Sequence, residues 1–375
     1  MARNVQHSLL PALSHDDRAR QSYVVDFKLA LNRRMRATNR EIYEQAVKPM
    51  LPESADPAQR RDIGRAMYAH PAYRQWCALA RAAQEQMWRS VSEPLERDRE
   101  RLQREFHKRS LDRAAGGSLD LRADFSPPRS VVARAIHLQP GGYAWDRGGD
   151  DVTAGALYET GGNLYAFGQG ISRSDSKAAH VQRFLGERYP DFRPKRILDL
   201  GCSAGAASVH YALAFPDAQV HAVDVGAGML RYAHARAEAL GARVHFHQAD
   251  CAATGFEDGY FDLVVSHNLL HEIPDRTRRA LFAESRRLLA PGGIALHQDV
   301  PLRFENYDEY QKFEYSWDTR NNNEPYWEVY ATADVEHDML AAGFDRSQLH
   351  VGQLSAASGS LPWFVAVARL PQVAQ

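Results

Sequence analysis

Residues 196–205 read Arg-Ile-Leu-Asp-Leu-Gly-Cys-Ser-Ala-Gly, an apolar run that leads directly into a glycine-rich turn. The run predicts a buried strand at 197–200, and the residues from Ala206 onward predict a helix. Glycines at 201 and 205 let the backbone turn tightly and let a ligand approach closely. Such a strand–turn–helix unit is typical of open α/β sheets, which bind ligands at the carboxyl ends of their strands.

Strands and helices are expected to alternate through the rest of this half of the chain, as in a parallel sheet. Further strands are expected at 220–223, 244–248, 263–266 and 294–298, with helices starting near Gly228 and Arg276 and a helix at 334–342. Two last strands, at 348–351 and 363–367, are expected to pair as an antiparallel hairpin. The sequence therefore predicts an α/β fold with a doubly wound, mostly parallel, seven-stranded sheet.

The first part of the chain has a different pattern. Residues 1–128 are expected to form an all-helical N-terminal domain, with apolar stripes at helical spacing and prolines 57 and 71 placed where a first helical turn tolerates them. A further helix is expected to start near Pro94. Glycine and proline clusters then predict a linker or lid segment at 129–190. Residues 191–375 are expected to form the ligand-binding domain, with an aromatic insertion at 302–330.

The composition favours neither a nucleic-acid nor a membrane partner. The chain has 375 residues and a formal charge of -1, and it contains no apolar run near the ~20 residues of a membrane helix. Its three cysteines, at 77, 202 and 251, are too widely spaced for a disulfide framework or a zinc site. We expect a cytoplasmic protein.

Two side chains of the glycine-rich turn favour a cationic ligand over a dinucleotide. Asp199 stands just before Gly201, where a carboxylate would repel a pyrophosphate but suits a ligand with an ammonium and a sulfonium group. Ser203 occupies the second glycine position of the dinucleotide fingerprint, where a side chain obstructs close approach of a diphosphate. The turn therefore predicts a positively charged adenosyl ligand.

Acidic residues end the next two predicted strands. Asp224 has the spacing of a residue that accepts hydrogen bonds from ribose hydroxyls, with a helix N-cap as the alternative role. Asp250 is placed to accept from an adenine amino group, or lies in a surface turn. Met229 covers an adenine face or simply packs in the core. Together these residues outline an adenosyl site along three strand ends.

In combination these motifs resemble the class I S-adenosylmethionine-dependent methyltransferases, over residues ~165–300. Asp199–Gly205 resembles the first motif of that family, Asp224 its acidic second-strand residue and Asp250 its adenine-side acidic residue, although Ser203 stands where the family commonly has glycine. The stretches 261–266, 288–293 and 363–367 resemble the fourth strand, the turn before the fifth and the antiparallel last strand. The resemblance implies a Rossmann-like methyltransferase with S-adenosyl-L-methionine as cofactor. Val225 and Cys251, beside the two acidic residues, join the expected cofactor site.

The segment after the fourth strand of the ligand-binding domain carries candidate catalytic groups, His271 and Glu272. It is similar to the segment that bears the catalytic histidine in small-molecule O-methyltransferases, which makes His271 a candidate general base. The alternative is a packing or substrate-orienting role. His267 is expected at the methionine end of the cofactor. His267 and His271 have the (i, i+4) spacing of a helical ligand pair, but no third ligand follows at the spacing of a known metal-binding motif. We therefore expect no metal.

Two aromatic segments are candidates for the acceptor pocket. The first, before the glycine-rich strand, holds Tyr143 and Trp145 as substrate contacts, with Tyr165 and Arg173 expected over the cofactor and Arg173 at its carboxylate. The second, the insertion, holds Tyr326 and Trp327, and Asn268 is expected to contact the acceptor as well. Ordinary packing of the inserted helices against the N-terminal domain explains the aromatics of this second segment equally well.

The leading hypothesis is a methyltransferase that acts on a small organic acceptor in specialised metabolism, with N-terminal helices that form a homodimer or cap the substrate. The alternatives are methylation of a protein or RNA, a non-catalytic S-adenosylmethionine-binding partner protein, and an NAD-dependent oxidoreductase. The last is disfavoured by Asp199 and Ser203.

Overall fold

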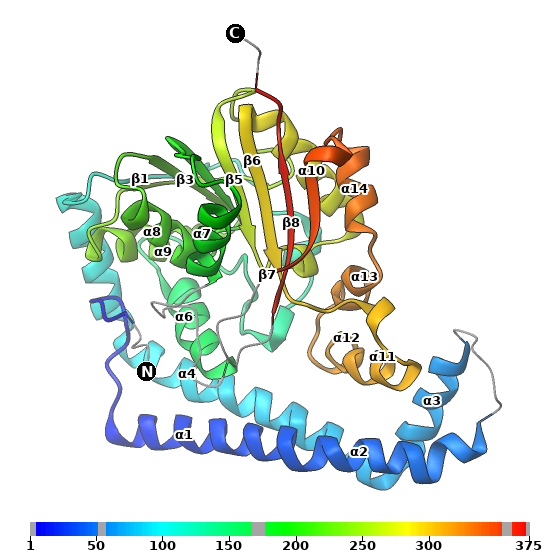
Figure 1. Ribbon diagram of the computed structural model, residues 1–375. Coiled ribbons are helices and arrows are strands. Elements are labelled where there is room, and N and C mark those ends of the chain that lie inside the picture. Colours follow the sequence, from blue (N-terminus) through cyan, green and yellow to red (C-terminus); the bar gives the residue numbers. More distant parts are fainter. Residues whose placement is uncertain (1–4, 52–57, 167–176, 355–361, 373–375) are drawn as a thin grey trace.

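The computed structural model describes residues 5–51, 58–166, 177–354 and 362–372, and a mixed sheet with helices on both faces forms its centre (Figure 1). The strands are β1 (Ser118–Asp120), β2 (Arg196–Leu200), β3 (Gln219–Asp224), β4 (Val244–Gln248), β5 (Phe261–His267), β6 (Leu289–Asp299), β7 (Leu349–Leu354) and β8 (Trp363–Arg369). Their order is β1-β4-β3-β2-β5-β6-β8-β7, and only β8 runs antiparallel to its neighbours, β6 and β7. The seven expected strands are all present, so the predicted doubly wound, mostly parallel sheet is confirmed.

The eighth strand, β1, lies in the stretch for which only helices were expected. It pairs in parallel with β4, with Ser118 opposite His245. The Glu238 carboxylate accepts hydrogen bonds from the N–H groups of Ala115 (2.8 Å) and Gly117 (2.9 Å), which fixes the chain just before this strand. A three-residue strand with a single apolar side chain leaves no periodic pattern in the sequence.

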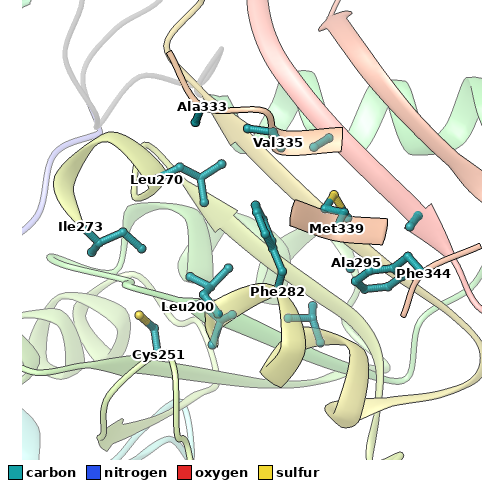
Figure 2. Close-up of a cluster of buried hydrophobic side chains, with 14 of the residues drawn as sticks. Leu200, Cys251, Leu270, Ile273, Phe282, Ala295, Ala333, Val335, Met339 and Phe344 are labelled. Carbon is teal, nitrogen blue, oxygen red and sulfur yellow. The ribbon is translucent and has the colours of Figure 1, made fainter. Parts of the chain in front are cut away.

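Helices bury both faces of the sheet. The helices α7 (Lys177–Arg188), α8 (Ala206–Ala214) and α9 (Ala227–Ala239) cover one face, and α10 (Asp275–Leu288) and α14 (Val335–Ala341) cover the other. Figure 2 shows the second face, where Phe282 of α10 and Met339 of α14 meet Leu200 and Ala295 of the strands. Because both faces are covered, β2 is an almost continuous apolar run rather than an alternating one.

The N-terminal region is helical from His15 to Asp112 in its described parts: α1 (His15–Ala30), α2 (Arg36–Ile42), α3 (Ala58–Ala69) and α4 (Pro71–Asp112). The sequence suggests a new helix near Pro94, but α4 runs through this residue without interruption. Proline cannot donate to the carbonyl of Ser90, four residues earlier. The side-chain amide of Gln21, in α1, donates to that carbonyl instead at 3.0 Å, which replaces the missing hydrogen bond.

The helix α6 (Thr153–Tyr165) joins the N-terminal helices to the sheet domain. A Cβ atom on Gly161 would lie 2.2 Å from the Trp88 ring of α4, and one on Gly155 would lie 2.2 Å from Tyr232 of α9. Glycine at these positions therefore allows α6 to pack closely on both sides. Between them, the fully buried Glu159 carboxylate accepts from Tyr232 Oη and Arg236 Nε, each at 2.9 Å.

The long α1 and α4 lie across the end of the molecule at which β5 and β6 terminate (Figure 1). The insertion after β6 forms α11 (Glu309–Tyr315), α12 (Trp317–Asn321) and α13 (Trp327–Ala331), of which α11 packs against α3, and the short α5 (Arg129–Val132) precedes α6. None of the described helices combines the length and apolar character that a membrane span requires. The edge where the strands end is thus covered by helices from two distant parts of the chain.

Candidate active site

The sheet reverses its order between β2 and β5. The chain places β3 and β4 on one side of β2 and then returns to place β5 and β6 on the other. In open α/β sheets this reversal leaves a crevice at the carboxyl ends of the two strands, where ligands bind. Gly201 follows β2 and Asn268 follows β5, so the segments that carry most of the expected site residues meet at this crevice.

The turn after β2 has the backbone conformation expected from its glycines. Gly201 and Gly205 have φ angles of +69° and +72°, in the left-handed region that glycine tolerates. Ser203 is also left-handed, with a φ of 44°, which is costly for a residue with a side chain. The Asp224 carboxylate accepts from the N–H groups of Ser203 and Gly226, both at 2.9 Å, and so stabilises the turn.

A cavity of about 750 Å³ opens at this crevice, and we refer to it as the switch-point cavity. Ten of the residues expected in the site line it: Tyr143, Gly201, Ser203, Asp224, Val225, Met229, Cys251, His267, Asn268 and Glu272. The other lining residues, most of them apolar, are Val131, Ile136, Tyr158, Val223, Ala249, Leu269 and Ile273. Apolar walls with a few polar groups are typical of small-molecule sites.

Other expected residues lie outside this lining. Asp199 is buried beneath the turn, where it accepts from Ser208 Oγ at 2.6 Å, and burial raises its pKa to about 7. The Asp250 carboxylate accepts from the N–H of Ala252 and closes the turn after β4. Gly205 caps the start of α8, and Trp145 packs on Gly141.

The two aromatics of the insertion are held by backbone groups. Tyr326 Oη donates to the carbonyl of Ser130 at 3.5 Å, and Trp327 Nε1 donates to that of Tyr315 at 2.9 Å. Neither lines the switch-point cavity, although the Trp327 ring lies 5.3 Å from the His271 ring. Arg173 lies outside the described residues.

Among the described residues that line the switch-point cavity, the charged side chains are all acidic. Asp224 and Glu272 are ionisable carboxylic acids, and no lysine or arginine accompanies them in that lining. His267 is held between Tyr211 Oη (2.9 Å) and Gln298 Oε1 (3.2 Å), and burial lowers its pKa to about 4, so it is neutral at pH 7. Glu272 is paired with His137 and His271, so Asp224 is the carboxylate of this lining that favours a cationic ligand over a diphosphate.

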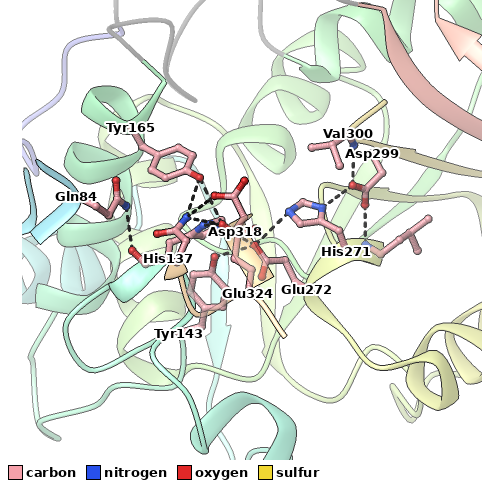
Figure 3. Close-up of polar contacts among 12 residues, drawn as sticks. Gln84, His137, Tyr143, Tyr165, His271, Glu272, Asp299, Val300, Asp318 and Glu324 are labelled. Atoms are coloured by element: carbon pink, nitrogen blue, oxygen red, sulfur yellow. Dashed lines mark hydrogen bonds and ion pairs between the residues drawn. The ribbon is translucent and has the colours of Figure 1, made fainter. Parts of the chain in front are cut away.

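His271 lies behind Glu272, between two carboxylates (Figure 3). Its Nδ1 lies 2.5 Å from Asp299 Oδ1 and its Nε2 lies 3.3 Å from Glu272 Oε1. Burial lowers the pKa of His271, but attraction to Asp299 and Glu272 outweighs burial and raises it to about 10. At this pKa His271 carries a proton near pH 7, and its Nε2 faces the Glu272 carboxylate.

His137 completes this network from a distant part of the chain. Its Nε2 lies 2.9 Å from Glu272 Oε1, and its Nδ1 lies 2.7 Å from Glu324 Oε1. Tyr143 Oη donates to Glu272 Oε1 at 3.0 Å. Burial raises the pKa of Glu272, but His137 and His271 outweigh burial and hold it below its usual range, so the Glu272 carboxylate is ionised.

A second cavity, of about 780 Å³, lies between the N-terminal helices and the insertion, and we refer to it as the cap cavity. Tyr165 lines it together with Asp318 and Asn322, and Asn322 Nδ2 donates to Tyr165 Oη at 3.2 Å. Asn322 Nδ2 also donates to Glu324 Oε1 at 2.6 Å, which links the wall of this cavity to the network of His137. The network therefore lies between the two cavities.

Three residues of the network were not expected from the sequence. Asp299 ends β6 beside β5, so the rule that carboxyl ends of neighbouring parallel strands meet could have identified it. His137 lies in a single 3₁₀ turn (Ile136–Leu138) and Glu324 lies between α12 and α13, and no spacing links either residue to Glu272. Only the folded chain brings them together.

Comparison with known proteins agrees with this architecture. A family model described as a methyltransferase domain matches residues 197–293, which include β2 to β5 and the start of β6. This match confirms, for that part of the chain, the resemblance to methyltransferases that the sequence motifs indicated.

Similar proteins include methyltransferases with different acceptors. Phosphoethanolamine N-methyltransferase 1 of Arabidopsis thaliana is 30% identical over 158 residues, 41% of this chain and 31% of that protein. Malonyl-[acyl-carrier protein] O-methyltransferase of Geobacter sulfurreducens is 35% identical over 137 residues, 34% of this chain and 49% of that protein. The chain thus spans less than half the length of either relative.

Among solved structures, phosphoethanolamine N-methyltransferase 2 of Haemonchus contortus, in complex with phosphomonomethylethanolamine and S-adenosylhomocysteine, is 21% identical. The likeness covers 58% of each chain, with a TM-score of 0.44.

Proposed function

We propose that this protein is an S-adenosylmethionine-dependent methyltransferase that acts on a small organic acceptor. The observation that carries the proposal is the switch-point cavity, which lies within a methyltransferase-type domain and has acidic but no basic side chains among its described lining residues. S-adenosylmethionine, a cationic adenosyl ligand, suits this lining, whereas the diphosphate of NAD does not.

The residues of the cavity suggest how the cofactor would be held. Asp224 keeps unused acceptor capacity on a carboxylate that is already fixed by two backbone N–H groups, which suits it to ribose hydroxyls. Met229 and Cys251 supply apolar walls for the adenine ring of the cofactor. When bound, S-adenosylmethionine supplies an electrophilic methyl group on a sulfonium centre.

Glu272 is proposed to meet the acceptor, because it is the member of the carboxylate–histidine network that lines the cavity together with Tyr143. Its ionised carboxylate would orient an acceptor O–H or N–H group, which is the positioning that methyl transfer chiefly requires. His271 acts through Glu272, as a positioning residue rather than as the general base.

A small acceptor is favoured because helices cover the site. Gln84 and Trp88 of α4 donate to the carbonyl of His137 at 3.0 and 2.6 Å, so the N-terminal helices help to build the network. This supports the capping role for these helices, while the homodimer and a place in specialised metabolism remain predictions. The cap cavity offers a route or a pocket for an organic molecule beside the network.

Calorimetric titration with S-adenosylmethionine and NAD tests the cofactor, and release of S-adenosylhomocysteine with a panel of phenols, carboxylic acids and amines tests the reaction. We expect S-adenosylmethionine alone to bind and at least one acceptor class to stimulate release. Binding of NAD alone would refute the proposal. Cofactor binding without turnover on any acceptor would favour the non-catalytic partner protein.

A further inference from the structure

We propose that His137, His271 and Glu272 form a binding site for one divalent first-row transition-metal ion, at the wall of the switch-point cavity. From the sequence we expected no metal, because no third ligand accompanies His267 and His271 at a short spacing. In the structure His267 turns away from His271, toward Tyr211 and Gln298. The third ligand comes from His137, 135 residues before Glu272.

The three side chains converge. One ligand atom from each lies within 4.8 Å of the other two. The Nε2 atoms of His137 and His271 lie 2.9 Å and 3.3 Å from the same oxygen, Glu272 Oε1. Ligand atoms bound to one ion at about 2.0–2.2 Å lie roughly 3.0–3.5 Å apart, so shifts below an ångström would seat an ion between them.

A carboxylate lies next to the outer ring nitrogen of each histidine, as is common for metal-bound imidazoles. A metal-binding histidine usually donates its other ring N–H to a carboxylate, which fixes the ring and the tautomer. The Nδ1 of His271 lies 2.5 Å from Asp299, and the Nδ1 of His137 lies 2.7 Å from Glu324. The Nδ1 of His271 thus makes a hydrogen bond to its carboxylate, whereas the Nδ1 of His137 lies within ion-pair distance of Glu324 without a hydrogen bond of good geometry. Both Nε2 atoms face Glu272 (Figure 3).

The supporting carboxylates are themselves held in place. Asp299 accepts from the N–H groups of Leu270 and Val300, each at 2.7 Å, and its side chain is fully buried. His137 has a φ of 55°, a left-handed conformation that costs energy and persists only where the surroundings impose it. Here two α4 side chains bind its carbonyl. Such rigid positioning is typical of a site built for a ligand.

Two imidazoles and one carboxylate leave at least one coordination position open, and Glu272 borders the switch-point cavity. The donor set suits zinc, iron, cobalt or nickel better than magnesium or calcium, which prefer oxygen ligands. An ion there would displace to solvent the protons that the two Nε2 atoms otherwise direct at Glu272. It would also bind a water molecule or an acceptor heteroatom. The inference does not depend on the proposed methyl transfer, because metal binding is measured without cofactor or acceptor.

The test uses the full-length chain, freed of metal by dialysis against a chelator and titrated with Co²⁺. Calorimetry gives the stoichiometry and affinity, and the visible spectrum reports the donor atoms. We expect one Co²⁺ per chain, displaced by Zn²⁺. Glu272→Gln and His137→Gln should each weaken binding by about tenfold or more, and Asp299→Asn by about 10–100-fold.

His247→Gln is the matched control, because His247 and His221 form another close histidine pair, 3.0 Å apart, on β4 and β3. This variant should bind Co²⁺ as the wild type does. Circular dichroism checks the fold of each variant. If a ligand variant does not fold, the wild-type spectrum and the His247→Gln titration decide together. Nitrogen and oxygen donors give d–d bands without the charge-transfer band of a thiolate, and unchanged binding in His247→Gln excludes the other histidine pair.

The proposal is overturned by substoichiometric cobalt in the wild type, by a thiolate band, or by full affinity in both Glu272→Gln and His137→Gln. Loss of binding in His247→Gln would place the ion at the other histidine pair and would overturn it too.

Discussion

Replacing Asp224 by asparagine should weaken S-adenosylmethionine binding far more than it changes the fold. The carboxylate accepts two backbone N–H groups, from Ser203 and Gly226, and it lines the switch-point cavity. Asparagine keeps the size but has a single acceptor oxygen, so its NH₂ group faces either a backbone N–H or the ribose. A hydrogen bond to a charged group contributes about 1.5–3 kcal/mol, which corresponds to a loss of roughly 10- to 150-fold in affinity.

Isothermal titration calorimetry with S-adenosylmethionine measures this loss, and Asp262→Asn is the matched control. Asp262 also accepts two backbone N–H groups, from Lys195 (2.9 Å) and Arg196 (2.8 Å), but at the opposite end of the strands. It does not line the switch-point cavity. The control should bind the cofactor normally. Equal affinities for Asp224→Asn and wild type would refute the assignment of Asp224 to the cofactor.

Three further predictions concern stability. Glu159→Ala removes the carboxylate that neutralises a buried arginine, so the free energy of unfolding in urea should fall by about 3–5 kcal/mol, and a loss below 1 kcal/mol would contradict this account. Gly161→Ala places a methyl group against Trp88 and should lower the free energy of unfolding by about 1–3 kcal/mol. The control Gly186→Ala, on α7, places its methyl group in open space and should not destabilise the protein. Equal melting temperatures for the two variants would refute this prediction. Burial lowers the pKa of His297 to about 3, so the stability that this neutral histidine contributes is complete above pH 6.5 and is lost as the pH falls toward 3. At pH 5 the free energy of unfolding should have fallen by roughly 2 kcal/mol on this account. His297→Gln should flatten the dependence of the unfolding free energy on pH between pH 7 and pH 5, and an unchanged slope would disprove this.

The central sheet was predictable because each strand buried on both faces is a short apolar run that ends in a turn. Residues 196–205 show this pattern most clearly, and β2 lies at the centre of the parallel strands. Prediction from local sequence fails where a residue distant in the chain satisfies a backbone group that the local sequence leaves without a hydrogen bond. Pro94 resembles a helix start, but Gln21 satisfies the carbonyl that proline leaves free, and α4 continues.

The candidate site was predictable only along the strand ends. Asp224 ends β3 and Glu272 lies in the segment after β5, and both line the cavity. Asp199 also belongs to a strand, yet its carboxylate accepts a hydrogen bond from Ser208 and does not line the cavity. The sequence could not predict this contact, because a period-two pattern gives the face on which a side chain lies but not its partner. His137 lies in an irregular segment, and its approach to Glu272 depends on how α4 covers the sheet edge.

A crystal structure of the complex with S-adenosylhomocysteine tests most directly whether the switch-point cavity is the cofactor site. The account predicts ribose hydroxyls within hydrogen-bond distance of Asp224, the base between Met229 and Cys251, and the sulfur atom on the side of Glu272. A ligand bound elsewhere, or one whose ribose lies away from Asp224, would contradict it.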